Sequence, residues 1–211
     1  MGVAFTYSEP LVWFEFVKDT ARIVREKGLK NVLVTNGYLN PEPLAELLPL
    51  IDAANIDLKS MDDLFYRKLC KARLEPVLAA IRQFRAAGVH LEITNLVIPG
   101  HNDRDDQITS LVDFVAELGA DVPLHFSAYH PAWKLSAPPT PLATLLRARE
   151  LAAVKLNHVY LGNASTTEGR DTVCPECGEV VIERSGYRVV DRLAAGGRCP
   201  GCETHIPGIV R

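Results

Sequence analysis

The stretch AANIDLKSM, residues 53–61, decides how the first part of this chain folds, because it reads as a buried strand that carries charge. Side chains alternate between the two faces of an extended strand, so Ile56 and Leu58 point to one side while Asp57 and Lys59 point to the other. The charged side faces either an ion pair that plugs the interior or a polar pocket. Periodicity alone favours the plug, because charges are kept inside proteins only when they are paired.

Strand-like and helix-like segments alternate along residues 1–165. Strand patterns cover 3–7, 31–38, 54–59, 90–100, 122–130 and 158–162. Helical spacing of apolar residues covers 11–27, 41–51, 75–87, 104–118 and 141–154. This alternation predicts an α/β fold in which helices cover parallel strands, as an open sheet or a barrel.

Polar side chains gather where the predicted strands end. In β/α barrels the functional groups lie at the carboxyl ends of the strands and in the loops that follow them. The residues at these positions are Ser8, Glu9, Thr35, Asn36, Asp57, Lys59, Asn95, Tyr129 and His130. The barrel interpretation therefore predicts a functional site at this end.

Composition and charge exclude some classes of protein. The net charge of −3 gives no basic surface, so we expect no nucleic-acid partner. No apolar run approaches the roughly 20 residues of a membrane span, and the start MGVAFTYSEPL lacks the features of a signal peptide. We expect a soluble, cytoplasmic protein without a membrane partner.

Residues 166–211 predict a separate, β-rich module. It contains the knuckles CPECG (174–178) and CPGC (199–202), with the strand-like pieces VVIERSG and YRVVDRL between them. Two Cys-x-x-Cys pairs at this separation are typical of a zinc ribbon, since zinc prefers four tetrahedral ligands. The predicted zinc ligands are Cys174, Cys177, Cys199 and Cys202. An iron–sulfur cluster or a redox dithiol is the alternative use of these thiols.

Other residues near the knuckles also receive a prediction. Gly178 and Gly201 are expected to supply permissive backbone in the two turns. His205 is a possible substitute metal ligand, although four cysteines already fill the shell. Cys70, the remaining cysteine, is expected to be a packing residue.

Taken together, the strand-end motifs resemble those of the radical S-adenosylmethionine (SAM) enzymes related to the pyruvate formate-lyase-activating enzyme. The motifs are AFTYSEP (4–10), VTNGY (34–38), NIDLKSM (55–61), LVIPGHND (96–103) and HFSAYHP (125–131). Within this group the radical SAM component of the AmmeMemoRadiSam system is most similar, and its members also carry a carboxy-terminal cysteine-rich ribbon. The resemblance covers nearly the whole chain and implies a partial (β/α) barrel of the radical SAM type followed by the ribbon.

The resemblance also implies a SAM pocket. The segment SEP (8–10) matches the place where relatives often have Gly-Gly-Glu-Pro, which contacts the SAM amino group, although Ser8 replaces a glycine. The residues implied to line the pocket are Ser8, Glu9, Thr35, Asn36, Asp57, Leu58, Lys59 and His130. SAM carries an ammonium and a carboxylate at its methionyl end, so such a pocket needs both an acidic and a basic side chain.

One family feature is missing from the chain. Radical SAM enzymes hold a [4Fe–4S] cluster through Cys-x-x-x-Cys-x-x-Cys, and these 211 residues contain no such triplet. We therefore expect an amino-terminal truncation that removes the first barrel strand and the cluster loop. The intact enzyme is implied to cleave SAM reductively and to start radical chemistry on an unknown substrate, such as a glycyl residue of a partner protein. The 211 residues alone are expected to be inactive.

Two other functions stay open at this stage. Lys59 at a barrel strand end could form a Schiff base with a carbonyl substrate, as in aldolases. Alternatively, the chain could be a zinc-ribbon adaptor that docks a partner without catalysis. A missing first strand would also expose the edge of 4–7 and favour association.

Overall fold

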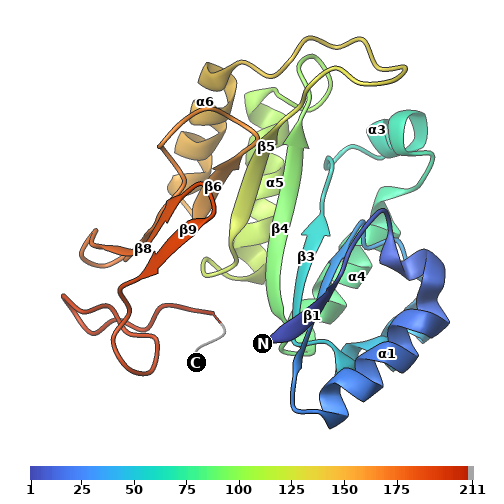
Figure 1. The fold of residues 1–211 in the computed structure, drawn as a ribbon. Coiled ribbons are helices and arrows are strands. Elements are labelled where there is room, and N and C mark those ends of the chain that lie inside the picture. Colours follow the sequence, from blue (N-terminus) through green and yellow to red (C-terminus); the bar gives the residue numbers. More distant parts are fainter. Residues whose placement is uncertain (209–211) are drawn as a thin grey trace. The chain divides into compact units, whose positions relative to one another are not determined.

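The structure is a computed structural model that describes residues 1–208, and the chain divides into two compact units, Met1–Asn95 and Leu96–Arg211. A parallel sheet of six strands runs in chain order from β1 to β6 (Figure 1). Its strands are β1 (Gly2–Phe5), β2 (Lys30–Thr35), β3 (Ala53–Asp57), β4 (His90–Val97), β5 (Leu124–Ala128) and β6 (Val159–Gly162). Strand β1 pairs with β2 and ends the sheet, as expected for the edge at residues 4–7.

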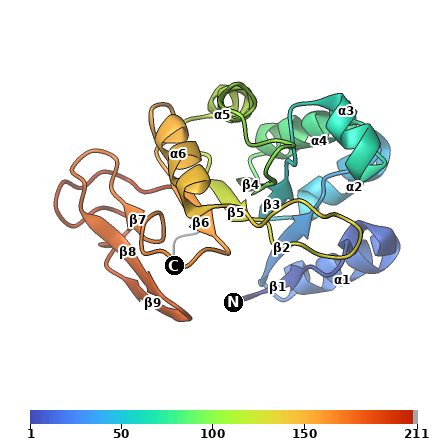
Figure 2. The same cartoon turned by 90° about the horizontal axis from the view of Figure 1, so that it is seen from above.

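Helices α1 (Phe14–Glu26), α2 (Pro41–Leu47) and α4 (Leu74–Ala86) cover the outer face of the strands in the first unit (Figure 2). Helix α1 shows why: Val17, Ala21 and Val24 are buried and recur every three or four residues, which places them on one face. The helix then stops before Gly28, whose φ of 69° terminates it.

In the second unit, helix α6 (Leu142–Ala153) contacts α5 (Asp105–Leu118) as well as β5 and β6. Asn102 fixes the turn that follows β4, because its side-chain oxygen accepts a hydrogen bond from Ile98 N at 2.6 Å and its amide donates to Leu96 O at 2.9 Å. Among the residues that the structure describes, no helix has the length and apolar character needed to cross a membrane.

The alternation predicted for AANIDLKSM is confirmed. Ile56 and Leu58 are fully buried, whereas the Asp57 and Lys59 side chains keep about a third of their surface, 35% and 31%. Strands β2, β3 and β4 are in parallel register, with Val32 opposite Ala53 and Ala53 opposite His90. The carboxyl ends of these strands therefore meet at one edge of the sheet.

The connection between β3 and α4 has structure that the sequence did not predict. Asp62 caps a short helix, α3 (Asp63–Phe65), by accepting a hydrogen bond from Leu64 N at 2.8 Å. A π-helical turn, Tyr66–Cys70, follows it directly. The turn buries Tyr66 and leaves Cys70 exposed, so the prediction that Cys70 is a packing residue is wrong.

The ribbon contains a small antiparallel sheet of β7 (Thr172–Val173), β8 (Val180–Ser185) and β9 (Arg188–Asp191). Strands β8 and β9 fall on the two predicted pieces, while the two-residue β7 is too short to leave a periodic signal. The buried core of the ribbon consists of Cys174, Val181, Cys199 and Ile206. Two of its four members are metal-ligand candidates, so this core is too small to hold the module by hydrophobic burial alone.

Neighbouring positions of β2 test the orientation of the sheet. Leu33 is fully buried and Val34 is 40% exposed. We expect Leu33→Ala to lower the free energy of unfolding by about 2–5 kcal/mol, because it leaves a cavity, and Val34→Ala to lower it by less than about 1 kcal/mol. Urea unfolding followed by circular dichroism measures both, and equal losses would contradict the described orientation.

Candidate functional site

The loop after β1 is tied to the end of β2 by the Glu9 carboxylate. Glu9 Oε1 accepts hydrogen bonds from Thr35 Oγ1 at 2.6 Å and from Leu11 N at 3.1 Å, and Oε2 accepts one from Asn36 N at 2.7 Å. A carboxylate offers about four acceptor positions, so one remains for a ligand. Glu9 therefore acts first as a brace between two strand ends. Ser8 beside it is exposed.

Gly37 lets the end of β2 approach β3. Its φ is 69°, and a Cβ at this position would lie 2.8 Å from Cγ2 of Ile56. Only glycine accommodates both the left-handed backbone and this contact. The turn is completed by Gly37 N, which donates to Thr35 Oγ1 at 3.1 Å, and by Tyr38 N, which donates to Asn36 Oδ1 at 2.8 Å.

Asp57 and Lys59 form an ion pair at the end of β3, with 2.7 Å between Asp57 Oδ2 and Lys59 Nζ. Lys59 N also donates a hydrogen bond to the Tyr66 hydroxyl at 3.1 Å. This hydrogen bond holds the π-helical turn against the site. Burial raises the pKa of Tyr66, so its hydroxyl stays protonated. Both charged side chains are partly exposed, so the pair is accessible to a ligand.

Asn95 completes this cluster from β4. Its side-chain amide donates to Leu58 O at 2.8 Å and to Lys59 O at 3.1 Å. Its Oδ1 is buried and has no hydrogen-bond partner in the described part of the chain. Buried polar atoms are nearly always paired, so this oxygen is an exception among the described residues of the first unit. The sequence placed Asn95 at a strand end but did not include it among the SAM-binding residues.

His130 belongs to the second unit and follows β5. Its ring Nε2 lies 3.1 Å from Asn163 O, which ties the loop after β5 to the loop after β6. The loop is further held by Thr140, whose hydroxyl donates to Val97 O at 2.6 Å and accepts from Tyr129 N at 2.8 Å. His130 thus sits at a strand end, as the sequence predicted for it.

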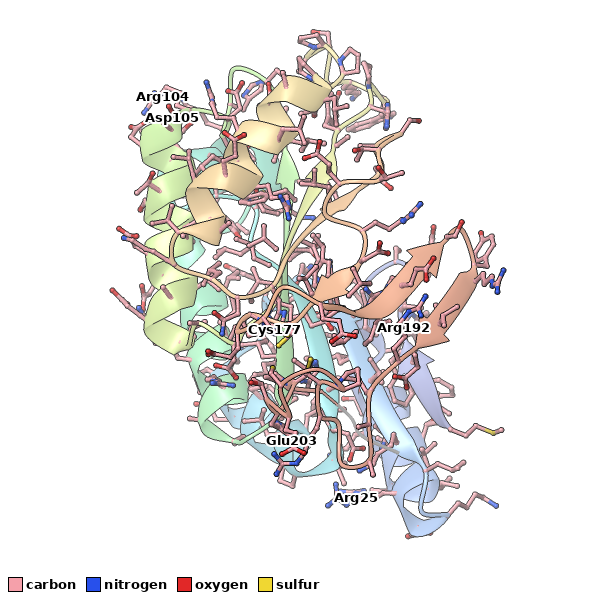
Figure 3. The ribbon with its side chains drawn as sticks, turned by 90° about the vertical axis from the view of Figure 1, so that its left-hand side faces the viewer. Arg25, Arg104, Asp105, Cys177, Arg192 and Glu203 are labelled. Carbon is pink, nitrogen blue, oxygen red and sulfur yellow. The ribbon has the colours of Figure 1, made fainter. Side chains whose placement is uncertain are left out.

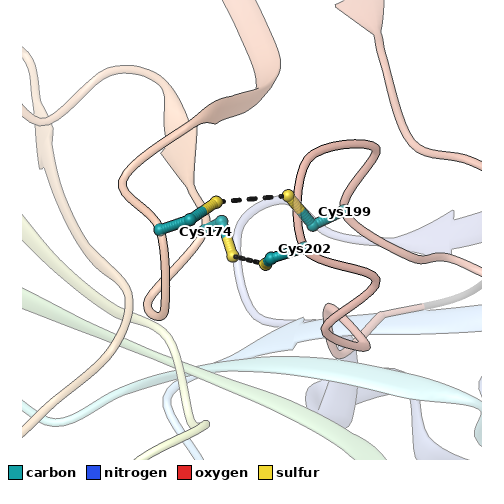
Figure 4. A group of neighbouring side chains, drawn as sticks. Cys174, Cys199 and Cys202 are labelled. Carbon is teal, nitrogen blue, oxygen red and sulfur yellow. Dashed lines mark hydrogen bonds between the residues drawn. The ribbon is translucent and has the colours of Figure 1, made fainter.

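The four ribbon cysteines converge. Their sulfur atoms all lie within 4.8 Å of one another, with 3.5 Å between Cys174 and Cys202 and 3.6 Å between Cys177 and Cys199 (Figures 3 and 4). Four sulfurs that each lie about 2.3 Å from one tetrahedral ion are about 3.8 Å apart, so the spacing fits a single metal ion. Hydrogen bonding with the Thr204 hydroxyl and backbone lowers the pKa of Cys202 to about 6, which favours its thiolate, the form that metals bind. The pKa of Cys199 is raised by burial, and that of Cys177 is raised by hydrogen bonds with the other thiols against the lowering effect of the Glu179 backbone.

The two knuckles have the same backbone design. Cys174 N donates to Glu179 O and Gly178 N to Cys174 O, while Cys199 N donates to Thr204 O and Glu203 N to Cys199 O. The equivalent turn positions, Gly178 and Glu203, have φ of 76° and 60°. The expectation that Gly201 supplies permissive backbone is therefore wrong, because Glu203 takes that conformation.

Gly201 instead packs against the end of the Glu179 side chain. A Cβ at Gly201 would lie 2.2 Å from Oε2 of Glu179, so the second knuckle closes over this carboxylate.

Among residues 1–208, the cysteine tetrad is the one cluster of three or more potential metal ligands, and His205 is not part of it.

Comparison with known proteins gives a consistent family signal. The model of the Radical SAM superfamily matches residues 2–112, which is more than half of the chain. An uncharacterized protein of Methanocaldococcus jannaschii is 49% identical over 210 residues, covering 97% of this chain and 62% of that protein. The pyruvate formate-lyase 1-activating enzyme of Escherichia coli is 29% identical over 131 residues, covering 61% of this chain and 53% of the enzyme. The chain thus spans less than two thirds of these relatives.

Solved structures confirm the fold. A domain of a pyruvate-formate lyase-activating enzyme from Bacteroides vulgatus matches 76% of this chain and 98% of that domain, with a TM-score of 0.67 at 23% identity. The prediction of a partial radical SAM barrel is therefore confirmed, and the cysteine cluster and small sheet fit the predicted ribbon.

The paired knuckles allow a matched test. We expect Gly178→Ala to destabilise the ribbon by roughly 1–2 kcal/mol, because a Cβ disfavours the left-handed backbone. Glu203→Gly removes the same conflict and should leave the ribbon at least as stable. Hydrogen exchange of the β8 and β9 amides measures the effect, and equal responses of the two variants would contradict the paired design.

Proposed function

This chain belongs to the radical SAM superfamily, and on that premise we propose that the strand-end cluster of its first unit forms part of a SAM site in an activase-like enzyme. The observation that carries the proposal is the partly exposed Asp57–Lys59 ion pair at the carboxyl end of β3. The pair offers an anion and a cation to a ligand at one strand end of the first unit.

The cluster suits the zwitterionic methionyl end of SAM. Lys59 can donate to the SAM carboxylate, while Asp57 can accept from its ammonium. A bound ligand would then replace the Asp57–Lys59 contact with two contacts of its own, so the charged groups stay compensated throughout. Glu9 keeps one acceptor position free and braces the loop of Ser8 against Thr35 and Asn36.

The other proposed contacts are less constrained. Leu58 is buried, so its side chain would not contact the ligand. Its proposed role is to hold the backbone between Asp57 and Lys59 in place. His130 is proposed to contact the nucleoside, on the strength of its place after β5 and of the HFSAYHP motif. Both assignments rest on the resemblance of these motifs to those of the family.

Radical chemistry also needs a [4Fe–4S] cluster, which would supply the electron that cleaves SAM. The cysteines of the chain are Cys70 and the four of the ribbon, and they do not form the family triplet. We propose that the cluster is held by cysteines outside these 211 residues, in a longer protein that includes the first barrel strand. The coverage of only 62% and 53% of the two relatives supports this proposal.

A partner protein is the proposed substrate. Relatives of the chain are named as activating enzymes of pyruvate formate-lyase, 4-hydroxyphenylacetate decarboxylase and isethionate sulfite-lyase, each of which is itself an enzyme. We place the chain in the AmmeMemoRadiSam branch because that group combines these strand-end motifs with a cysteine-rich ribbon.

The ribbon cysteines are proposed to bind zinc. Single-ion spacing of the sulfurs favours one metal over a [4Fe–4S] cluster, because a cluster places a separate iron behind each thiolate and spreads the sulfurs further apart. With all four positions filled by protein, such a site is structural and holds the small ribbon core together. It would need reduced thiols, which fits the cytoplasmic location that we propose.

The Schiff-base alternative finds no support in the geometry. Lys59 Nζ is engaged with Asp57, and a nucleophilic lysine must instead be a neutral, unengaged amine.

The SAM proposal is tested by isothermal titration of the chain with SAM. We expect Lys59→Met to weaken binding by roughly tenfold or more, because a hydrogen bond to a charged group contributes about 1.5–3 kcal/mol. The matched control is Lys30→Met, since Lys30 pairs with Asp52 at the same 2.7 Å but at the amino end of β2. Equal affinities of the two variants would refute the assignment. The absence of SAM binding both by the folded chain and by a longer protein that carries the cluster would refute it as well.

The zinc proposal is tested by metal analysis of the purified chain. We expect about one zinc per chain, lost in Cys174→Ser and Cys202→Ser because three thiolates bind the ion more weakly than four. Cys70→Ser is the control and should retain the metal. Visible absorption typical of an iron–sulfur cluster, or zinc that persists in both ribbon variants, would contradict the proposal.

A further inference from the structure

Helix α1 has a second apolar side in addition to the one that packs on the sheet. Phe16 and Ile23 are seven positions apart, so they lie about two turns apart on the same side of the helix. Their exposed fractions are 67% and 53%. Val12 and Trp13, in the 3₁₀ turn that leads into α1, extend this side and are 75% and 70% exposed. These four residues form the apolar stripe of α1.

The apolar stripe faces away from the neighbouring helix α2. Lys18 marks the side of α1 that faces α2, because its Nζ lies 2.8 Å from Oε2 of Glu46 on that helix. At about 100° per residue, Phe16 and Ile23 lie about 160° and about 140° around the helix from Lys18. The stripe therefore points past β1, the strand that ends the sheet. Figure 2 shows α1 as the last helix of the first unit, beside β1.

The other sheet-covering helices of the first unit have no such side. Helices α2 and α4 bury their large apolar residues and expose none. Single exposed apolar residues are normal on protein surfaces, whereas a contiguous exposed patch marks a contact site. The difference fits the position of α1, because it is the one of these three helices that lacks a neighbouring helix on one side in the described part of the chain.

The free edge of β1 points to the same neighbour. Strand β1 pairs with β2 along Gly2–Phe5 and with no other strand among residues 1–208. An edge strand presents N–H and C=O groups that can pair with a further strand. The strands of this sheet follow chain order, and crossovers between parallel strands are right-handed. A strand that precedes β1 in the chain would therefore add at this edge, and the helix that follows it would lie beside α1.

We propose that the apolar stripe is the docking surface for a helix of the segment that precedes Met1 in the longer protein, and that the strand of the same segment pairs with β1. The proposal rests on the longer protein of the proposed function. The chain covers 62% and 53% of two relatives, which leaves length for such a unit. Trp13 and Phe16 anchor the contact, since aromatic side chains bury large areas.

Hydroxyl-radical footprinting with mass spectrometry tests the docking surface by comparing the 211-residue chain with the longer protein over a series of dilutions. Oxidation of Trp13 and Phe16 should fall by roughly threefold or more in the longer protein, because the docked helix excludes water from them. Trp133, which is 91% exposed and belongs to the second unit, is the matched control and should react equally in both proteins.

Three outcomes of the footprinting would overturn the proposal. Equal oxidation of Trp13 in the two proteins would show that the preceding segment does not cover the stripe. Protection of Trp13 that disappears on dilution would assign the stripe to a second copy of the protein. Equal protection of Trp13 and Trp133 would show that the effect is not specific to α1. The readout needs no SAM, so its failure is distinguishable from failure of the SAM site.

A variant measures the same contact through stability. Phe16→Ser should lower the melting temperature of the longer protein by roughly 2 °C or more, because it removes a buried contact there. It should leave that of the 211-residue chain unchanged, since Phe16 is already exposed in it. Val154→Ser, at an 81% exposed position after α6, is the control and should change neither protein. Equal shifts of the two proteins by Phe16→Ser would contradict the proposal.

Discussion

The parallel pairing of β1 to β4 is the constraint on which the candidate site depends. Parallel strands bring their carboxyl ends to one edge, so residues that are far apart in the chain become neighbours there. Glu9 joins the loop after β1 to the end of β2, and Asn95 joins β4 to the backbone of Leu58 and Lys59. Hydrogen bonds between strand ends thus build a shared polar surface from four separate segments.

Local periodicity was sufficient to predict much of this arrangement. The alternation around Ile56 and Leu58 placed Asp57 and Lys59 together, and the structure pairs them at 2.7 Å. The same periodicity could not separate an inert ion pair from a ligand site, since both need compensated charge. The hydrogen bonds from Asn95 to Leu58 O and Lys59 O, which hold the end of β3, depend on contacts between strands that a single sequence does not reveal.

The two sequence predictions that are wrong, for Cys70 and Gly201, fail for specific structural reasons. Cys70 lies on an amphipathic stretch, but the π-helical turn leaves it exposed and buries Tyr66 instead. In the ribbon, Glu203 adopts the left-handed backbone that the sequence assigns to Gly201, while Gly201 packs against the end of the Glu179 side chain. Residue type predicts a backbone conformation only where no tertiary contact competes.

The central claim is that the Asp57–Lys59 pair opens to receive the methionyl end of SAM. A crystal structure of the longer protein with its cluster and SAM bound tests this most directly. The account predicts the SAM carboxylate within hydrogen-bond distance of Lys59 Nζ and its ammonium near Asp57. An intact Asp57–Lys59 ion pair with SAM bound elsewhere would contradict it.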